Sequence, residues 1–157
     1  MLLKYLACFF VSMVPLVELR LAVPMAVSMS LSYWPSLVVC VIGNLLPVPI
    51  IYFFARKVLE WGKDKKYIGG FFGWCLRKGE SGGHKLTQRA GRTGSFLALM
   101  LFVGIPLPGT GAWTGTLAAS FLDMGIKTTS LAVSAGVVLA GIIMGIVALT
   151  GVHVFGL

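Results

Sequence analysis

The segment Gly104-Ile-Pro-Leu-Pro-Gly-Thr-Gly-Ala-Trp-Thr-Gly115 lies in the middle of a hydrophobic stretch without charges, where an unbroken helix is otherwise expected. A second segment, Pro15-Leu-Val-Glu-Leu-Arg-Leu-Ala-Val-Pro24, interrupts an earlier stretch in the same way. Proline lacks the N–H group that a helix interior needs, and glycine is conformationally permissive, so both segments predict a break in helical structure. These two breaks decide the fold.

Each break divides a hydrophobic stretch, 1–31 or 93–122, that has an awkward length for a membrane. One crossing takes about 20 residues, so each stretch is too long for one crossing and too short for two. Two half-length helices joined by a non-helical tip fit both the length and the breakers. Each stretch therefore predicts a re-entrant hairpin, with tips at 15–24 and 104–115, whereas 36–55 and 129–149 each fit a single transmembrane helix.

The composition requires a lipid environment for most of the surface. Hydrophobic residues make up 57% of the 157 residues and charged residues 11%, and the mean hydropathy is +0.93. A soluble domain carries roughly 25% charged residues. We therefore expect an all-α integral membrane protein that forms a single membrane domain over 1–157.

The charges are concentrated in one segment, 56–92, which holds ten of the thirteen basic residues and three of the five acids. Short loops rich in Lys and Arg stay cytoplasmic, so the net charge of +8 predicts a cytoplasmic loop of a multi-pass inner-membrane protein rather than nucleic-acid binding. Aromatic residues beside these cations favour helices that lie on the membrane surface. The glycine-rich run 79–83 predicts a turn between them.

The sidedness of this loop makes the two halves of the chain inverted relative to each other. With 56–92 in the cytoplasm, the first hairpin opens outside and the second opens to the cytoplasm, so 1–55 and 93–157 predict an inverted repeat. Pro15 and Pro106 open the two tips, and Gly43 and Gly136 fall at similar places in the following helices. Irregular backbone at membrane depth must be buried or line a cavity, so the two tips are expected to face each other.

Glu18 and Arg20 are the leading candidates for a substrate or ion site, because an ionised group at membrane depth costs roughly 2.5–3.5 kcal/mol. Either they pair with each other on an irregular backbone, or each reaches a separate partner. Arg20 suits carboxylate or phosphate oxygens, and Glu18 suits a cation or a proton. The alternative is an ion pair that only fixes the hairpin fold.

The second tip has no charge, but its glycines free backbone N–H groups that could bind an anion at a helix N-terminus. Its candidate site residues are Pro106, Pro108, Gly109, Thr110, Gly111, Trp113 and Thr114. The alternative here is that the glycines only permit close helix packing. Asn44, followed by Pro47 and Pro49, either lines the cavity or bonds to a neighbouring helix.

Other chemistry is not indicated. Cys8, Cys40 and Cys75 are far apart, and His84 and His153 give no metal-ligand spacing, so neither a metal nor a cofactor is expected. The sequence shows no nucleophile–base set and no paired carboxylates. An enzyme is therefore not predicted.

The tip motifs at 15–24 and 104–115, together with Gly43-Asn44 and its following prolines, resemble the putative small multidrug export protein family of bacteria and archaea. This resemblance covers nearly the whole chain and implies a membrane transporter. The opposed hairpins are also similar in layout to the DedA superfamily, whose members are implicated in flipping isoprenoid-phosphate carrier lipids. DedA proteins carry acidic and arginine residues around both hairpins, whereas the second tip here has none.

The function expected from these features is secondary transport with alternating access around the tips, coupled to protons through Glu18. The substrate is either a small amphipathic compound that is exported or a lipid phosphate that is flipped. The alternative is a membrane scaffold or subunit in which the hairpins serve assembly. Two crossings and two hairpins are few for enclosing a pathway, so a homodimer in contact with membrane lipids is expected.

Overall fold

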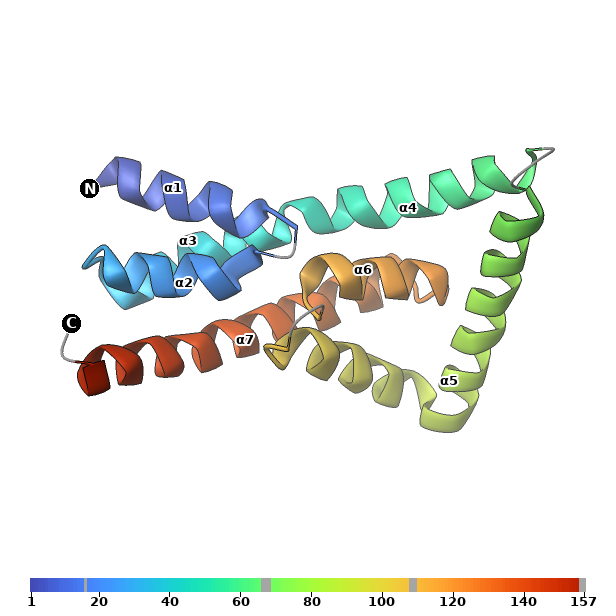
Figure 1. Cartoon of the computed structure of the whole chain (residues 1–157). Coiled ribbons are helices and arrows are strands. Elements are labelled where there is room, and N and C mark those ends of the chain that lie inside the picture. The colour runs from blue at the N-terminus through green and yellow to red at the C-terminus, as the bar shows by residue number, and fades with distance from the viewer. Residues whose placement is uncertain (16, 66–68, 108–109, 156–157) are drawn as a thin grey trace.

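The fold is helical throughout the part of the chain that the computed structural model describes, which is residues 1–15, 17–65, 69–107 and 110–155. No strand occurs in these ranges, so the prediction of an all-α chain is confirmed. The helices, seen in Figure 1, are α1 (Leu2–Met13), α2 (Glu18–Ser28), α3 (Tyr33–Leu45), α4 (Pro47–Lys63), α5 (Gly69–Gly104), α6 (Ala112–Phe121) and α7 (Ile126–Phe155).

Two long apolar helices are able to cross a bilayer by length and composition. Helices α3 and α4 join through Leu46, whose backbone is itself helical, so 33–63 forms one rod. The most apolar 18 residues of this rod have a mean hydropathy of 2.3. Most of α7 forms the other long helix, and its most apolar 18 residues have a mean hydropathy of 2.5. The crossing segments expected at 36–55 and 129–149 lie inside these helices, which extend beyond them on both sides.

The remaining apolar helices form two hairpins whose turns face each other in the middle of the molecule (Figure 1). Helix α1 packs along α2, and the second half of α5 packs along α6. Helices α1, α2 and α6 have 12, 11 and 10 residues. At about 1.5 Å per residue they reach roughly half of a ~30 Å hydrocarbon core. Their insertion into a membrane from opposite faces stays a prediction.

The non-helical part of each turn is shorter than the sequence suggested. In the first hairpin, α1 ends at Met13 and α2 already begins at Glu18, so Pro24 lies inside a helix. In the second hairpin, α6 begins at Ala112, so the end of the expected 104–115 tip is helical. The predicted tip ranges were therefore too long. Glu18 and Arg20 sit in the first turn of a helix rather than on an extended strand of chain.

The later part of the basic segment, from Gly69 on, belongs to helix α5, which turns a corner. Helix α5 changes direction at Gly91, whose φ of 68° and ψ of −179° suit a residue without a Cβ. The part before Gly91 runs across the ends of the other helices rather than alongside them (Figure 1). This orientation fits the expected surface-lying helix. The turn expected at 79–83 is wrong, because those residues continue the helix.

Helix α4 is joined to the far end of the second hairpin by polar contacts. The Tyr52 hydroxyl donates to the Met124 carbonyl at 2.7 Å, and the Ser120 hydroxyl donates to the Tyr52 carbonyl at 3.1 Å. Arg56 pairs with both Asp123 and Glu60 at the same end. These contacts fix the base of the second hairpin to the first spanning rod.

We expect the charged part of this junction to contribute little stability. Arg56, Glu60 and Asp123 have side chains that are 36%, 51% and 49% exposed, and pairs of this kind contribute about 0–1 kcal/mol. Arg56→Ala should therefore lower the thermal unfolding temperature in detergent only slightly, and less at high salt. Lys57→Ala is the matched control. A large loss that persists at high salt would contradict this view of the pair.

Candidate functional site

The Glu18 carboxylate binds the N-terminus of α6, across the gap between the two hairpins. The backbone N–H of Ala112 donates to Oε2 at 3.1 Å, and that of Trp113 donates to Oε1 at 3.0 Å. The first N–H groups of a helix have no partner within it and carry partial positive charge, so a carboxylate there is doubly favoured. Glu18 is 3% exposed, so this charge is neutralised by backbone rather than by water.

Arg20 reaches the loop that precedes α6. One guanidinium nitrogen donates to the Leu107 carbonyl, and another donates to the Thr110 hydroxyl at 2.6 Å. The Thr110 hydroxyl in turn has two carbonyls of its own loop within donating distance, those of Ile105 at 2.8 Å and Leu107 at 2.9 Å. Arg20 therefore holds the shape of the second tip as well as its position.

Glu18 and Arg20 thus serve separate partners. The ion pairs among the described residues join Arg56 to its two acids, and none joins Glu18 to Arg20. Of the two readings that the sequence left open, the structure has the one in which each charge contacts the opposite hairpin. We call these hydrogen bonds from Glu18 and Arg20 to 107–113 the tip contact.

Two further residues complete the tip contact. The Trp113 indole N–H donates to the Met13 carbonyl at 3.2 Å, at the end of α1. Gly111 has a φ of 144° and a ψ of −173°, a conformation that is essentially restricted to glycine. A Cβ on Gly111 would lie 2.7 Å from Cδ of Glu18, so the carboxylate fits only because this residue has no side chain.

The other sequence candidates are placed differently. Thr114 donates to the Gly111 carbonyl at 3.4 Å, so it serves its own helical turn. Pro106 is half-buried in the loop before Leu107 and shapes the chain without a contact of its own in the tip contact. Pro108 and Gly109 lie outside the described residues. Asn44 is 1% exposed in α3, and its side-chain oxygen accepts no hydrogen bond.

Sequence reasoning missed several positions of the candidate site because they contribute backbone groups. The carbonyls of Met13 and Leu107 and the N–H of Ala112 carry no signal in their side chains. It also missed Thr116, which is fully buried in α6, one turn beyond Ala112, with a hydroxyl that has no partner. The sequence offered one signal for Thr116, which is that it is a polar residue among small apolar neighbours.

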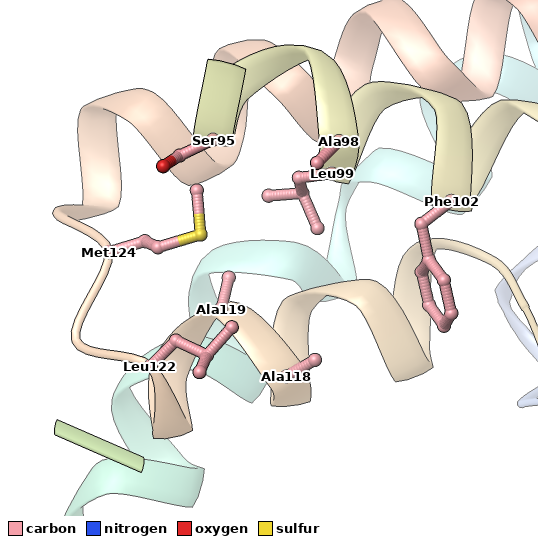
Figure 2. Close-up of a pocket in the computed structure, with 8 residues that line it drawn as sticks. All are labelled: Ser95, Ala98, Leu99, Phe102, Ala118, Ala119, Leu122 and Met124. Atoms are coloured by element: carbon pink, nitrogen blue, oxygen red, sulfur yellow. The ribbon is translucent and has the colours of Figure 1, made fainter. Parts of the chain in front are cut away.

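Two apolar clefts flank α6, on its faces toward α5 and toward α4. The first, drawn in Figure 2, has a volume of about 170 Å³ and is lined by Ser95, Ala98, Leu99, Phe102, Ala118, Ala119, Leu122 and Met124. All of these belong to the second hairpin or the turn after it, and no residue of the tip contact is among them. The cleft on the α4 side includes Trp113 and is larger, about 360 Å³.

No metal site is found among the described residues. They contain no group of three His, Cys, Asp or Glu side chains that could hold a metal ion. The charged groups near the middle of the molecule are Glu18 and Arg20, and both are held by hydrogen bonds to the opposite tip.

Two apolar helices long enough to span a bilayer, with a buried carboxylate between two helical hairpins, are features of the class of small helical membrane transporters. The chain belongs to the putative small multi-drug export protein family, which it matches over residues 18–143. The matched range includes Glu18, Arg20, residues 107–113, all of the 33–63 rod and the first part of α7. No curated protein and no solved structure matches the chain. The family supports a membrane location and a role in export rather than catalysis.

Proposed function

We propose that the protein is a secondary transporter in which the substrate passes between the two hairpin tips, and that protonation of Glu18 opens the tip contact. The hairpins insert from opposite faces, and the two halves of the chain form an inverted repeat around the tips. The observation that carries this proposal is the binding of the buried Glu18 carboxylate to the N-terminus of α6.

The register between the halves supports the inverted repeat, since corresponding residues lie 91 positions apart up to the tip prolines and 93 positions apart after them. A Cβ on Gly43 would meet the Phe9 carbonyl at 2.6 Å, and one on Gly136 would meet the Met100 carbonyl at 2.6 Å. The separation from Phe9 to Met100 equals that from Pro15 to Pro106. Each glycine therefore lets its long helix approach the first arm of its own hairpin at a corresponding place.

The return helices of the two hairpins end in the same way, which adds to this support. Ser30 after α2 and Asp123 after α6 both have a positive φ, 58° and 53°. The next N–H in each case bonds back to a carbonyl near the helix end, from Leu31 to Ala26 and from Met124 to Ala119. Ser30 and Asp123 are separated by the same distance in the chain as Gly43 and Gly136.

The tip contact has the properties of a gate that a proton can open. Glu18 itself has a φ of 51°, which is costly for a residue with a side chain, and such strain persists where surrounding contacts fix it. Hydrogen bonds to an ionised acceptor are roughly twice as strong as neutral ones. Protonation of Glu18 therefore weakens its bonds to α6 and relieves a strained backbone, so the tips separate.

Two unpartnered polar groups support a second arrangement of the same helices. The Asn44 side-chain oxygen and the Thr116 hydroxyl are buried and have no hydrogen-bond partner among the described residues. In the proposed cycle, parting of the tips gives both groups new partners.

The substrate is either an amphipathic compound that is exported or a lipid phosphate that is flipped, because the released site offers both a carboxyl group and a guanidinium. The rival function is an assembly scaffold. In a scaffold, the bonds of Glu18 and Arg20 to the second tip serve only to hold the two hairpins together.

Transport by the purified full chain in liposomes tests the proposal, using ethidium and fluorescent phosphatidic acid as probes with and without a pH gradient. The wild type should move at least one probe in a gradient-dependent way. Glu18→Gln and Arg20→Ala should lower that rate by about tenfold or more, the factor that ~1.4 kcal/mol represents, while elution from a size-exclusion column is unchanged.

Glu60→Gln and Arg89→Ala are the matched controls, since both side chains are exposed at the basic end of the molecule. They should leave the rate unchanged. If the wild type moves neither probe, and the Glu18 and Arg20 variants aggregate, the scaffold is the better account. Equal transport in Glu18→Gln and wild type would exclude the proton gate.

A further inference from the structure

The apolar groove between α4 and α6 leads from the tip contact to the basic end of the molecule. Helix α4 contributes Ile51, Phe54, Ala55 and Val58, and helix α6 contributes Trp113, Leu117 and Phe121. The spacing on each helix is three or four residues, so both sets follow one face of their helix. The groove is therefore continuous along both helices rather than a local gap.

The size and lining of the groove suit an apolar ligand. Its volume of about 360 Å³ lies within the range of roughly 300–1,000 Å³ that is typical of ligand sites. Phe54 is 67% exposed and Phe121 is 38% exposed, so the groove opens sideways. In a bilayer this opening faces hydrocarbon, and the molecules available there are lipid chains.

The inner end of the groove touches the tip contact through Trp113. Its backbone N–H binds Glu18, its indole N–H binds Met13, and its ring lines the groove. An apolar chain in the groove therefore ends against a side chain that both hairpins hold. No rearrangement is needed to bring such a chain to the tips.

The outer end of the groove continues into an aromatic and cationic surface. Phe54, Val58 and Trp61 follow one face of α4, and the Lys65 ammonium lies 4.4 Å from the centre of the Trp61 ring. Lys57, Lys63 and Lys65 are exposed there, and the nearby acids are Asp64 and the two partners of Arg56, Glu60 and Asp123. Tryptophan and lysine at this level suit the headgroup layer, and the excess of lysine suits an anionic headgroup.

We propose that this groove binds an acyl chain of an anionic phospholipid from the leaflet next to the basic segment, with the headgroup at Lys57 and Lys65. This inference rests on the proposed function, since it gives an amphipathic substrate a sideways route to the tips. The competing occupant is a helix of a second copy of the chain.

Quenching of a single tryptophan tests the groove without transport. Trp34, Trp61 and Trp74 are replaced by phenylalanine, which leaves Trp113, and the protein is placed in phosphatidylcholine vesicles. Phosphatidylglycerol with brominated acyl chains should quench Trp113 at lower lipid fractions than brominated phosphatidylcholine does. Leu117→Phe should lose most of this quenching, whereas Leu131→Phe, on the exposed face of α7, should keep it.

A second pair of substitutions keeps the test decisive if the groove variant does not fold. Lys57→Gln with Lys65→Gln should remove the preference for phosphatidylglycerol without filling the groove. Unquenched Trp113 in the parent, or equal quenching in the Leu117 and Leu131 variants, would overturn the proposal. Cross-linking of two copies through Leu117→Cys would assign the groove to a partner chain instead. Quenching without transport would leave the groove in place and remove only the proposed function.

Discussion

Gly111→Ala should abolish transport and lower the thermal unfolding temperature by many degrees. The new Cβ would lie 2.7 Å from Cδ of Glu18, in a backbone conformation that is essentially restricted to glycine. The backbone strain costs about 1–3 kcal/mol. Displacing the carboxylate from two N–H groups adds about 1.5–3 kcal/mol, because the hydrogen bonds to a charged acceptor are lost.

Gly125→Ala is the matched control for this substitution. Gly125 precedes α7, a Cβ there meets nothing within 4 Å, and its backbone needs no positive φ. The measurements are unfolding temperature in detergent and gradient-driven transport in liposomes. If both alanine variants behave alike, the carboxylate does not occupy the position described, and the tip contact is not what holds the hairpins together.

Gly136→Ala should separate the second hairpin from the long helix α7. Its Cβ would lie 2.6 Å from the Met100 carbonyl and 2.7 Å from Cβ of Val103, so rigid backbone, rather than a flexible side chain, is in the way. Overpacking of this kind costs typically about 1–3 kcal/mol. Gly43→Ala should have a comparable effect in the first half, because the Phe9 carbonyl lies 2.6 Å from its Cβ position.

Gly151→Ala, also on α7, controls for helix propensity. It meets nothing within 4 Å, and alanine is favoured over glycine in a helix by up to about 1 kcal/mol. We expect it to be neutral or slightly stabilising, whereas Gly136→Ala should unfold at a clearly lower temperature. Equal unfolding temperatures for the two variants would show that the α5–α7 crossing is looser than described.

Much of the fold could be predicted from helix breakers and from length. The prolines and glycines near positions 15 and 106 marked turns, and stretches of that length left room only for short arms. Glu18 and Arg20 stood out because a charged side chain at membrane depth has a high insertion free energy and usually faces a partner or a cavity. Both arguments rest on a free-energy cost that can be recognised from residue types alone: the lost hydrogen bond at a proline, and the desolvation of a charged side chain.

The details that were wrong depend on contacts between distant residues. The run 79–83 has four residues of glycine or serine that weaken a helix, yet each such cost is at most about 1 kcal/mol, and the chain instead turns at Gly91. Pro24 did not end its helix, because one missing hydrogen bond is tolerated where neighbouring helices pack around it. Neither outcome is visible in local sequence.

The partners of the two charges could not be predicted either. The sequence presented a carboxylate and a guanidinium two residues apart, and it offered no opposing charge in the second tip. The answer is that carbonyl and N–H groups of the second tip supply the opposing partial charges. Such partners depend on where α6 begins, and that boundary was not predicted to the residue.

Glu18 and Gly111 lie as far apart in the chain as Gly43 and Gly136, so they hold corresponding places if the two halves form the proposed inverted repeat. One place has a carboxylate and the other has no side chain at all. If the halves exchange conformations during transport, the exchanged state cannot rebuild the same bonds. The two orientations then differ in free energy, and the molecule rests preferentially in one of them. The inequality of the two halves thus sets which orientation is more populated, whereas the gradients of substrate and protons set the direction of net transport.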